Sequence, residues 1–169
     1  MRVLLRHFIS MTSVLSVCPL GQVSSASADE FEVEFPPGAF CSGFAVLGDI
    51  TVKGSEKILP GDRFWEHNVG TGIWTNAESG QTFTQRFRYA SVSMYDEAAN
   101  DLHVTVDGRY FTGFYPGKTG PAGPVTEPET YSVAGHQTFT IDLDTNAITA
   151  YSLDGEILAD IRAVLAGES

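Results

Sequence analysis

The side chain with the most distinctive chemistry in this sequence is Cys41, in the segment PPGAFCSGF. A cysteine acts as a nucleophile or a metal ligand only as the thiolate, which needs a neighbouring base or cation to form near neutral pH. No residue close to Cys41 in the sequence is an evident base, so a catalytic thiol would require a distant histidine brought near by the fold. The alternative is a small, buried, apolar side chain.

The candidate metal ligands are the three histidines outside the N-terminal segment, His67, His103 and His136. They lie on separate segments, without the His-x-His or Cys-x-x-Cys spacing that brings ligands onto one metal ion. We therefore expect surface or loop histidines and no metal site. His67, which follows Glu66, is the first candidate if such a site exists.

The segment DLDTN, residues 142–146, places oxygen-bearing side chains at alternate positions, as the start of a calcium loop does. An EF-hand requires glycine at the sixth position and glutamate at the twelfth, but these positions hold Ala147 and Leu153. A hairpin turn between strands that end at Leu143 and begin at Ala147 explains the same residues. The sequence also lacks a Gly-x-Ser-x-Gly elbow, a phosphate-binding loop and a dinucleotide fingerprint, so we expect no cofactor.

Aromatic side chains are the candidates for a ligand pocket. In a β-barrel such side chains fill the interior, and only a remaining void turns them into a binding site. The candidates are Trp65, Trp74, Phe83, Phe87, Tyr110 and Phe114.

A long loop, YPGKTGPAGPVTEPETY at residues 115–131, is the candidate for partner binding. Its prolines stiffen the backbone and its glycines bend it. Long ordered loops in compact domains are frequent binding sites, although a plain surface excursion is commoner. The candidate contact residues are Pro116, Lys118, Pro121 and Pro124.

The first 28 residues have the pattern of an export signal. Two positive charges in MRVLLRH precede a short apolar run, and the small residues of ASA, ending at Ala28, fit a signal-peptidase site. A rival interpretation is a lipid anchor on Cys18, since LSVC resembles a lipobox, but Val17 stands where a small residue is normal. We expect a secreted protein that begins at Asp29, and no segment has the length of a membrane-spanning helix.

Removal of residues 1–28 leaves enough chain for one domain and too little for two. Loss of Arg2 and Arg6 lowers the number of Lys and Arg residues from ten to eight against 21 acidic residues, so the formal net charge falls from −11 to −13. Such a surface repels phosphate backbones and anionic headgroups, so we expect neither nucleic acid nor a membrane surface as a partner. The predicted divisions are an N-terminal extension at 29–39 and a single β-domain at 40–169.

Alternation of apolar and polar residues predicts half-buried β-strands. The segments TFTQRFR (82–88), DLHVTV (101–106) and TFTIDL (138–143) alternate in this way. The segment RYFTGFY (109–115) has aromatic residues on both faces, which predicts a strand covered on both sides. Turn residues separate these segments, so successive strands are expected to pair as an antiparallel meander.

The end of the chain, DGEILADIRAVLAG, changes to a helical period. The pattern predicts a helix over 155–166, capped by Asp154 and ended by Gly167, with an apolar stripe that packs against the sheet. The predicted fold is therefore all-β: an antiparallel meander of about eight strands, closed as a barrel or curled as a sandwich, with one C-terminal α-helix. The apolar residues at helical spacing are Ile157, Ile161, Val164 and Leu165.

These features together resemble a large family of small secreted β-proteins from actinobacteria. The resemblance covers most of residues 38–166 and rests on the N-terminal FC, the TN…SGQT hairpin, the GPAGP loop, the DLDTNAITAYSLDGEILADI ending and the signal peptide. It implies no activity. In the family the terminal helix often reads D-[VIL]-C-A-x-L, with a second cysteine where this chain has Arg162. The resemblance therefore implies that Cys41 is half of a lost disulfide and lies near Arg162.

Two functional hypotheses follow. The preferred one is a non-enzymatic exported β-domain, an envelope or extracellular interaction module that presents the 116–130 loop to an unknown protein. The alternative is a lipocalin-like carrier of a small apolar ligand; a cavity lined by Trp65, Trp74 and Phe87 would favour it, whereas a filled interior would favour the module. An enzyme ranks third and would need His67 or His103 to cluster with two carboxylates in a cleft.

Overall fold

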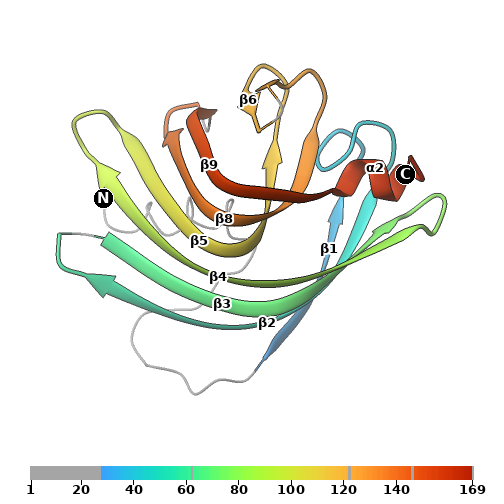
Figure 1. Ribbon diagram of the computed structural model, residues 1–169, viewed down its shortest axis with the longest axis horizontal. Coiled ribbons are helices and arrows are strands. Elements are labelled where there is room, and N and C mark those ends of the chain that lie inside the picture. Colours follow the sequence, from blue (N-terminus) through green and yellow to red (C-terminus); the bar gives the residue numbers. More distant parts are fainter. Residues whose placement is uncertain (1–27, 62, 122, 146, 169) are drawn as a thin grey trace.

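The computed structural model describes residues 28–61, 63–121, 123–145 and 147–168, and its fold is almost entirely β (Figure 1). Seven strands form one sheet in the order β1-β2-β3-β4-β5-β8-β9, and every neighbouring pair is antiparallel, which confirms the predicted meander. A hairpin of β6 (Thr119–Gly120) and β7 (Gly123–Pro124) lies between β5 and β8. The seven strands are β1 (Asp29–Phe35), β2 (Val46–Leu59), β3 (Arg63–Asn76), β4 (Thr82–Asp96), β5 (Asp101–Phe114), β8 (Glu129–Asp142) and β9 (Ala147–Asp160).

The predicted alternation of buried and exposed residues is confirmed in β4 and β5. In β4, Gln85 and Phe87 are buried, whereas the alternate residues Arg86 and Arg88 are exposed. The three apolar residues of DLHVTV, at 102, 104 and 106, are all buried in β5. One face of the sheet therefore forms the core, and the other is the outer surface.

The sheet is curled but does not close on itself. Of the two predicted forms, the chain therefore adopts the curled sandwich and not the barrel. β4 and β5 pair only as far as Arg88 and Arg109; beyond these residues β4 stays with β3, and β5 stays with β8. Figure 1 shows the ends of β5 and β8 turning upward from β2, β3 and β4 at this division, while β9 runs on to α2. Gln85 of β4 connects the two halves of the sheet across this division, because its Nε2 donates to the Tyr110 carbonyl of β5 at 3.1 Å and to Ser132 Oγ of β8 at 3.0 Å.

A row of six facing residues, four of them glycine, crosses the sheet where it curls. Gly108 and Gly135 have φ values of 125° and 132°, a region that other residues rarely adopt. A Cβ atom on Gly135 would lie 2.4 Å from the carbonyl oxygen of Asp154. Missing side chains let neighbouring strands approach and bend together. This glycine row consists, strand by strand from β2 to β9, of Gly54, Asn68, Tyr89, Gly108, Gly135 and Gly155.

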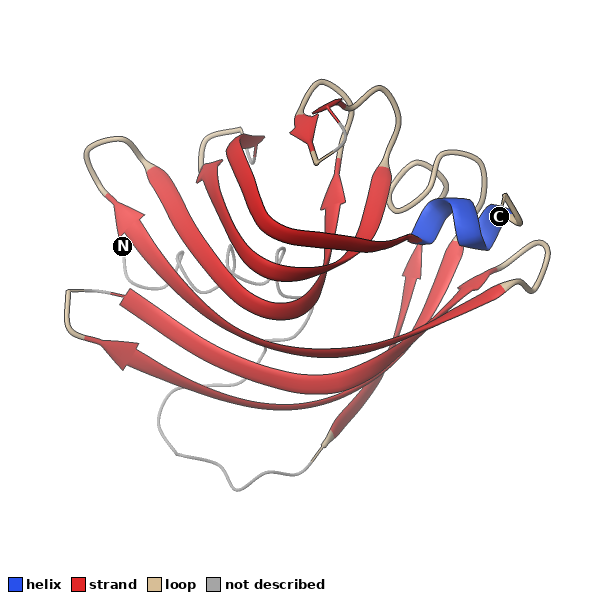
Figure 2. Ribbon diagram, viewed as in Figure 1, coloured by secondary structure: helices blue, strands red, loops and turns tan. Residues whose placement is uncertain are grey.

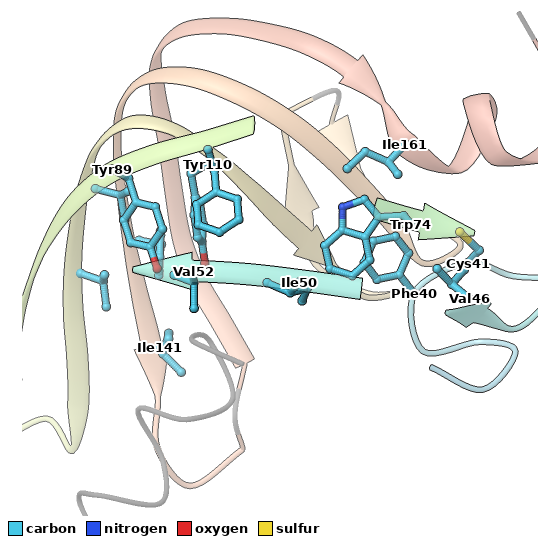
Figure 3. Close-up of a cluster of buried hydrophobic side chains, with 14 of the residues drawn as sticks. Phe40, Cys41, Val46, Ile50, Val52, Trp74, Tyr89, Tyr110, Ile141 and Ile161 are labelled. Atoms are coloured by element: carbon cyan, nitrogen blue, oxygen red, sulfur yellow. The ribbon is translucent and has the colours of Figure 1, made fainter. Parts of the chain in front are cut away.

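The core is centred on Trp74, which is 0% exposed. Its ring stacks on Phe40, with the centroids 5.0 Å apart, and meets the ring of Phe111 edge-on at 5.1 Å. Cys41 and Ile161 are equally buried, and Figure 3 shows both near the rings of Trp74 and Phe40. The N-terminal loop, both halves of the sheet and the helix therefore share one core.

The helix is shorter than the sequence predicts. β9 continues to Asp160, and helix α2 spans only Ile161–Ala166, so the predicted helix start at 155 is wrong (Figure 2). Pairing with β8 on one side holds 147–160 as a strand, and tertiary pairing of this kind overrides a local helical period. In the described part of the chain, no helix has the length and hydropathy that crossing a membrane requires.

The helix cap differs accordingly. Asp160, not Asp154, is the N-cap, and its carboxylate accepts a hydrogen bond from the Ala163 amide at 3.0 Å. Gly167 ends the helix with a φ of 77°, as predicted. Only two of the four residues predicted for the apolar stripe, Ile161 and Leu165, are fully buried.

Candidate functional site

The loop between β5 and β8 is internally hydrogen-bonded. The Val125 amide donates to the Lys118 carbonyl at 2.8 Å, and the Gly117 amide donates to the Val125 carbonyl at 3.0 Å. Val125 itself is buried in a small second apolar cluster beneath the loop. The loop therefore presents a defined surface. Of the predicted partner residues, Pro116 and Pro124 are exposed, and Lys118 and Pro121 are half-buried.

An open hollow of about 400 Å³ lies between this loop and β9, a volume within the usual range of ligand sites. β9 is the last strand of the sheet, and within the described residues no strand pairs with its outer side. A strand edge of this kind is a template on which an extended segment can add. The hollow is lined by Gly120 and Pro121 from the loop and by Tyr151, Ser152, Leu153, Gly155 and Ile157 from β9.

The lining of the hollow is partly apolar and partly polar, and Tyr151 contributes a hydroxyl group to it. Burial raises the pKa of Tyr151 to about 12, so the hydroxyl stays protonated at neutral pH and donates to Gln137 Oε1 at 3.2 Å. The ring packs edge-on against Phe114, with 4.8 Å between centroids. Asp154 and Glu156, both exposed, add negative charge along the same strand. The hollow is therefore suited to an apolar side chain from a segment that carries positive charge.

Sequence reasoning missed the β9 lining because it assigned 155–166 to a helix. Tyr151, Leu153, Gly155 and Ile157 follow at every second position, which is the period of a strand. This signal competes with the helical spacing that begins at Ile157. Of the residues predicted to bind a partner, the structure brings only Pro121 to the hollow.

The six aromatic candidates do not share one pocket. Trp74, Phe87 and Phe114 are 0%, 3% and 1% exposed, and Tyr110 is 8% exposed, so these rings pack within the core. Phe83 is partly buried against the same core.

Trp65 lies on the opposite face of the sheet from Trp74. The two tryptophans are on β3, an odd number of residues apart, and successive side chains of a strand point to opposite faces. Lys57 Nζ lies 4.5 Å from the centroid of the Trp65 ring, in a cation–π contact on the outer surface.

A buried polar cluster on the core face was also missed. Ser91 Oγ donates to Glu66 Oε1 at 3.0 Å, and Asn68 Nδ2 donates to Tyr89 Oη at 2.9 Å. Burial, with smaller contributions that include the charge of Glu66, raises the pKa of Tyr89 and Tyr110 far above the usual range, so both phenols stay neutral. Strand alternation from Trp74 places Glu66 and Asn68 on the core face, and this is the signal that could have found them.

The hairpin turn predicted at DLDTN is confirmed. β8 ends at Asp142 and β9 begins at Ala147, within one residue of the prediction. Asp142 Oδ1 accepts hydrogen bonds from the Thr145 amide at 2.8 Å and the Thr145 hydroxyl at 2.9 Å, which lower the pKa of this carboxyl group. These are the contacts of a turn-capping aspartate.

The histidines lie apart from one another. His103 Nε2 is 4.0 Å from an Asp96 carboxylate oxygen, His136 Nδ1 is 2.7 Å from an Asp107 oxygen, and His67 stacks beside an aromatic ring. Within the described ranges, no group of three or more His, Cys, Asp or Glu residues is placed to hold a metal ion.

Cys41 is a buried free thiol. Its side chain is 0% exposed, and burial raises the pKa of the thiol to about 11, while the nearby charge of Arg162 offsets part of this rise. Arg162 therefore lies within electrostatic reach of Cys41. Whether the two positions are within disulfide distance stays a prediction.

We expect Cys41 to resist iodoacetamide at pH 7.5 in the folded protein and to react completely in denaturant, because only the accessible thiolate is alkylated. Intact-mass spectrometry before and after denaturation measures both states. A matched control is Cys41→Ala combined with Ser55→Cys, which puts the thiol at an exposed strand position. Native alkylation of Cys41 as fast as that of the control would contradict the assignment.

Comparison with protein-family models finds no match for this chain, and comparison with curated proteins and with solved structures finds none either.

Proposed function

We propose that this protein is an exported, non-enzymatic interaction module that binds an extended segment of another protein in the hollow between its 115–128 loop and β9. The observation that carries the proposal is the hollow itself, which joins the loop to β9, the last strand of the sheet within the described residues. The edge supplies backbone hydrogen-bonding groups, and the hollow supplies a pocket for a side chain. Peptide recognition by strand addition uses this combination.

Charge and composition favour one kind of partner. Ile157 is 43% exposed and Leu158 is 36% exposed, so β9 presents apolar surface beside its acidic residues. A segment with alternating apolar and basic residues complements that pattern. We expect the partner to be extracellular, since the export signal at 1–28 is part of this proposal; residues 1–27, including the alternative lipid anchor Cys18, lie outside the described residues.

The packing of the aromatic residues supports the module over the carrier. A carrier needs a void lined by the aromatic candidates, but Trp74, Phe87 and Phe114 contact other core side chains and Trp65 faces the outer surface.

Site-specific photo-crosslinking tests the proposal. Benzoylphenylalanine placed at Pro121 or at Ile157, on the two sides of the hollow, is expected to form an adduct with the same partner when the protein is secreted from its own host. The matched control carries the same group at Thr84, an exposed position on the outer face of β4. Equal adduct formation at Thr84, or adducts with unrelated proteins from the two hollow positions, would refute the hollow as the docking site.

The substitution Ile157→Glu is expected to reduce partner binding at least about tenfold, because it removes an apolar contact and adds charge at the hollow. Because Ile157 is half-exposed, stability should change by less than about 1 kcal/mol. Crosslinking yield from Pro121 and a urea titration measure the two effects. Unchanged crosslinking with an unchanged fold would contradict the prediction.

A further inference from the structure

The outer face of the sheet carries a concentration of positive charge that the proposed function does not use. The described residues contain eight Lys and Arg residues, since Arg2 and Arg6 lie outside them. Six of the eight lie on the outward face of β2–β5, although the chain as a whole is strongly acidic. These six are Lys53, Lys57, Arg63, Arg86, Arg88 and Arg109.

Three of these cations lie in one line across the strands. The register pairs Lys53 with Val69, Val69 with Arg88, and Arg88 with Arg109. Neighbouring strands are about 4.8 Å apart, so the line from Lys53 to Arg109 is about 14 Å long. Arg86, two residues from Arg88 on the same face, flanks it. We call these four residues the basic row.

The basic row has no acidic partner within the described residues. The ion pairs found there join other groups, and none includes a residue of the row. Asp107, two residues before Arg109 on the same face, contacts His136 instead. Glu156 lies in the same line but two strands beyond Arg109, about 10 Å away.

This arrangement costs stability unless an anion joins it. Arg88 and Arg109 face each other directly, and like charges in directly opposed positions destabilise a sheet. Guanidinium groups bind phosphate with two parallel hydrogen bonds, and several in a line match a ligand with repeated charges. Thr71, which faces Arg86, adds a hydroxyl group beside the row.

We infer that the basic row binds a phosphodiester polymer of the polyol-phosphate type, laid across β2 to β5. Such a polymer carries one negative charge on each phosphate group along an extended chain. Nucleic acid fits less well, because single-stranded binding sites stack bases on aromatic rings, whereas the positions between the cations hold Val69 and threonine, and the Trp65–His67 pair lies to one side of the row. The overall negative charge limits attraction to other anions, so binding depends on the row itself.

Binding of poly(glycerol phosphate) to the full protein, measured calorimetrically at 50 and 150 mM NaCl, tests the inference. The double variant Arg88→Gln/Arg109→Gln is expected to bind at least about tenfold more weakly and to show a smaller salt dependence, because fewer counterions are released. The matched control is Arg63→Gln/Arg162→Gln, which changes the net charge equally but leaves the row intact.

Three outcomes would overturn the inference: no binding by the unmodified protein at 50 mM salt, equal loss in both double variants, or tighter binding of single-stranded DNA. Poly-glutamate serves as a carboxylate polymer in parallel, and equal affinity for it would overturn the assignment to phosphodiesters. Circular dichroism confirms that each variant is folded, since all four positions have side chains at or near the surface.

Discussion

The variant Gly135→Ala is expected to lose about 3 kcal/mol or more of its free energy of unfolding. Holding a residue other than glycine in a forbidden backbone region costs about 1–3 kcal/mol. At φ 132° the added Cβ atom also meets the Asp154 carbonyl oxygen at 2.4 Å and the Gly155 Cα atom at 2.6 Å. Both contacts are with the backbone of the neighbouring strand, so relief requires β8 and β9 to separate.

Urea titration followed by tryptophan fluorescence measures this effect as a lower midpoint at an unchanged slope. The matched control is Gly113→Ala in β5, because Gly113 does not have a positive φ and the nearest atom to a Cβ added there is Thr130 Oγ1 at 3.7 Å. The control is expected to change stability by less than about 1 kcal/mol. Equal losses in the two variants would show that the glycine row has no special role.

The variant Arg162→Cys is expected to form a disulfide with Cys41 under oxidising conditions and to gain up to about 4–5 kcal/mol of stability. The bridge would close a loop of more than 100 residues, for which the chain-entropy model gives this gain. The charge of Arg162 acts on the Cys41 thiol, so the two positions lie in one neighbourhood. The ion pair that Arg162 loses, with Glu168 at 3.4 Å, is at the surface and contributes little.

Thermal unfolding with and without reductant isolates the bridge. The oxidised variant is expected to melt about 10 °C higher than the reduced one, given the usual dependence of melting temperature on stability at this chain length. Arg162→Ser is the matched control, because it removes the same charge without adding a thiol. A free thiol count of two after oxidation would mean that the positions exceed the disulfide limit of about 7 Å between Cα atoms.

Local patterns predicted the fold class because they act within single strands. The alternation at 82–88 and 101–106 identified the core face of β4 and β5 directly, and the turn residues at 142–146 marked the hairpin between β8 and β9. The helix boundary was wrong because Ile157 fits both a strand and a helical stripe. Only the pairing of β9 with β8, which is remote from the local pattern, decides between them.

The candidate sites depended on register, which the sequence did not reveal. Lys53, Arg88 and Arg109 are far apart in the chain, and only the alignment of β2 to β5 places them in one line. The two tryptophans illustrate the same limit. From the sequence, Trp65 and Trp74 were predicted to line one pocket. Both lie on β3, an odd number of residues apart, so their side chains point to opposite faces of the sheet.

The meander has a consequence for how the chain reaches this shape. Nearly every strand pairs with its neighbour in sequence, so most of the sheet can form hairpin by hairpin. The closing contacts are different: Thr130 Oγ1 donates to the Phe40 carbonyl and Asn76 Nδ2 to the Leu165 carbonyl, across 90 and 89 residues. We therefore expect these contacts, and the packing of the C-terminal helix over Trp74, to form after the hairpins.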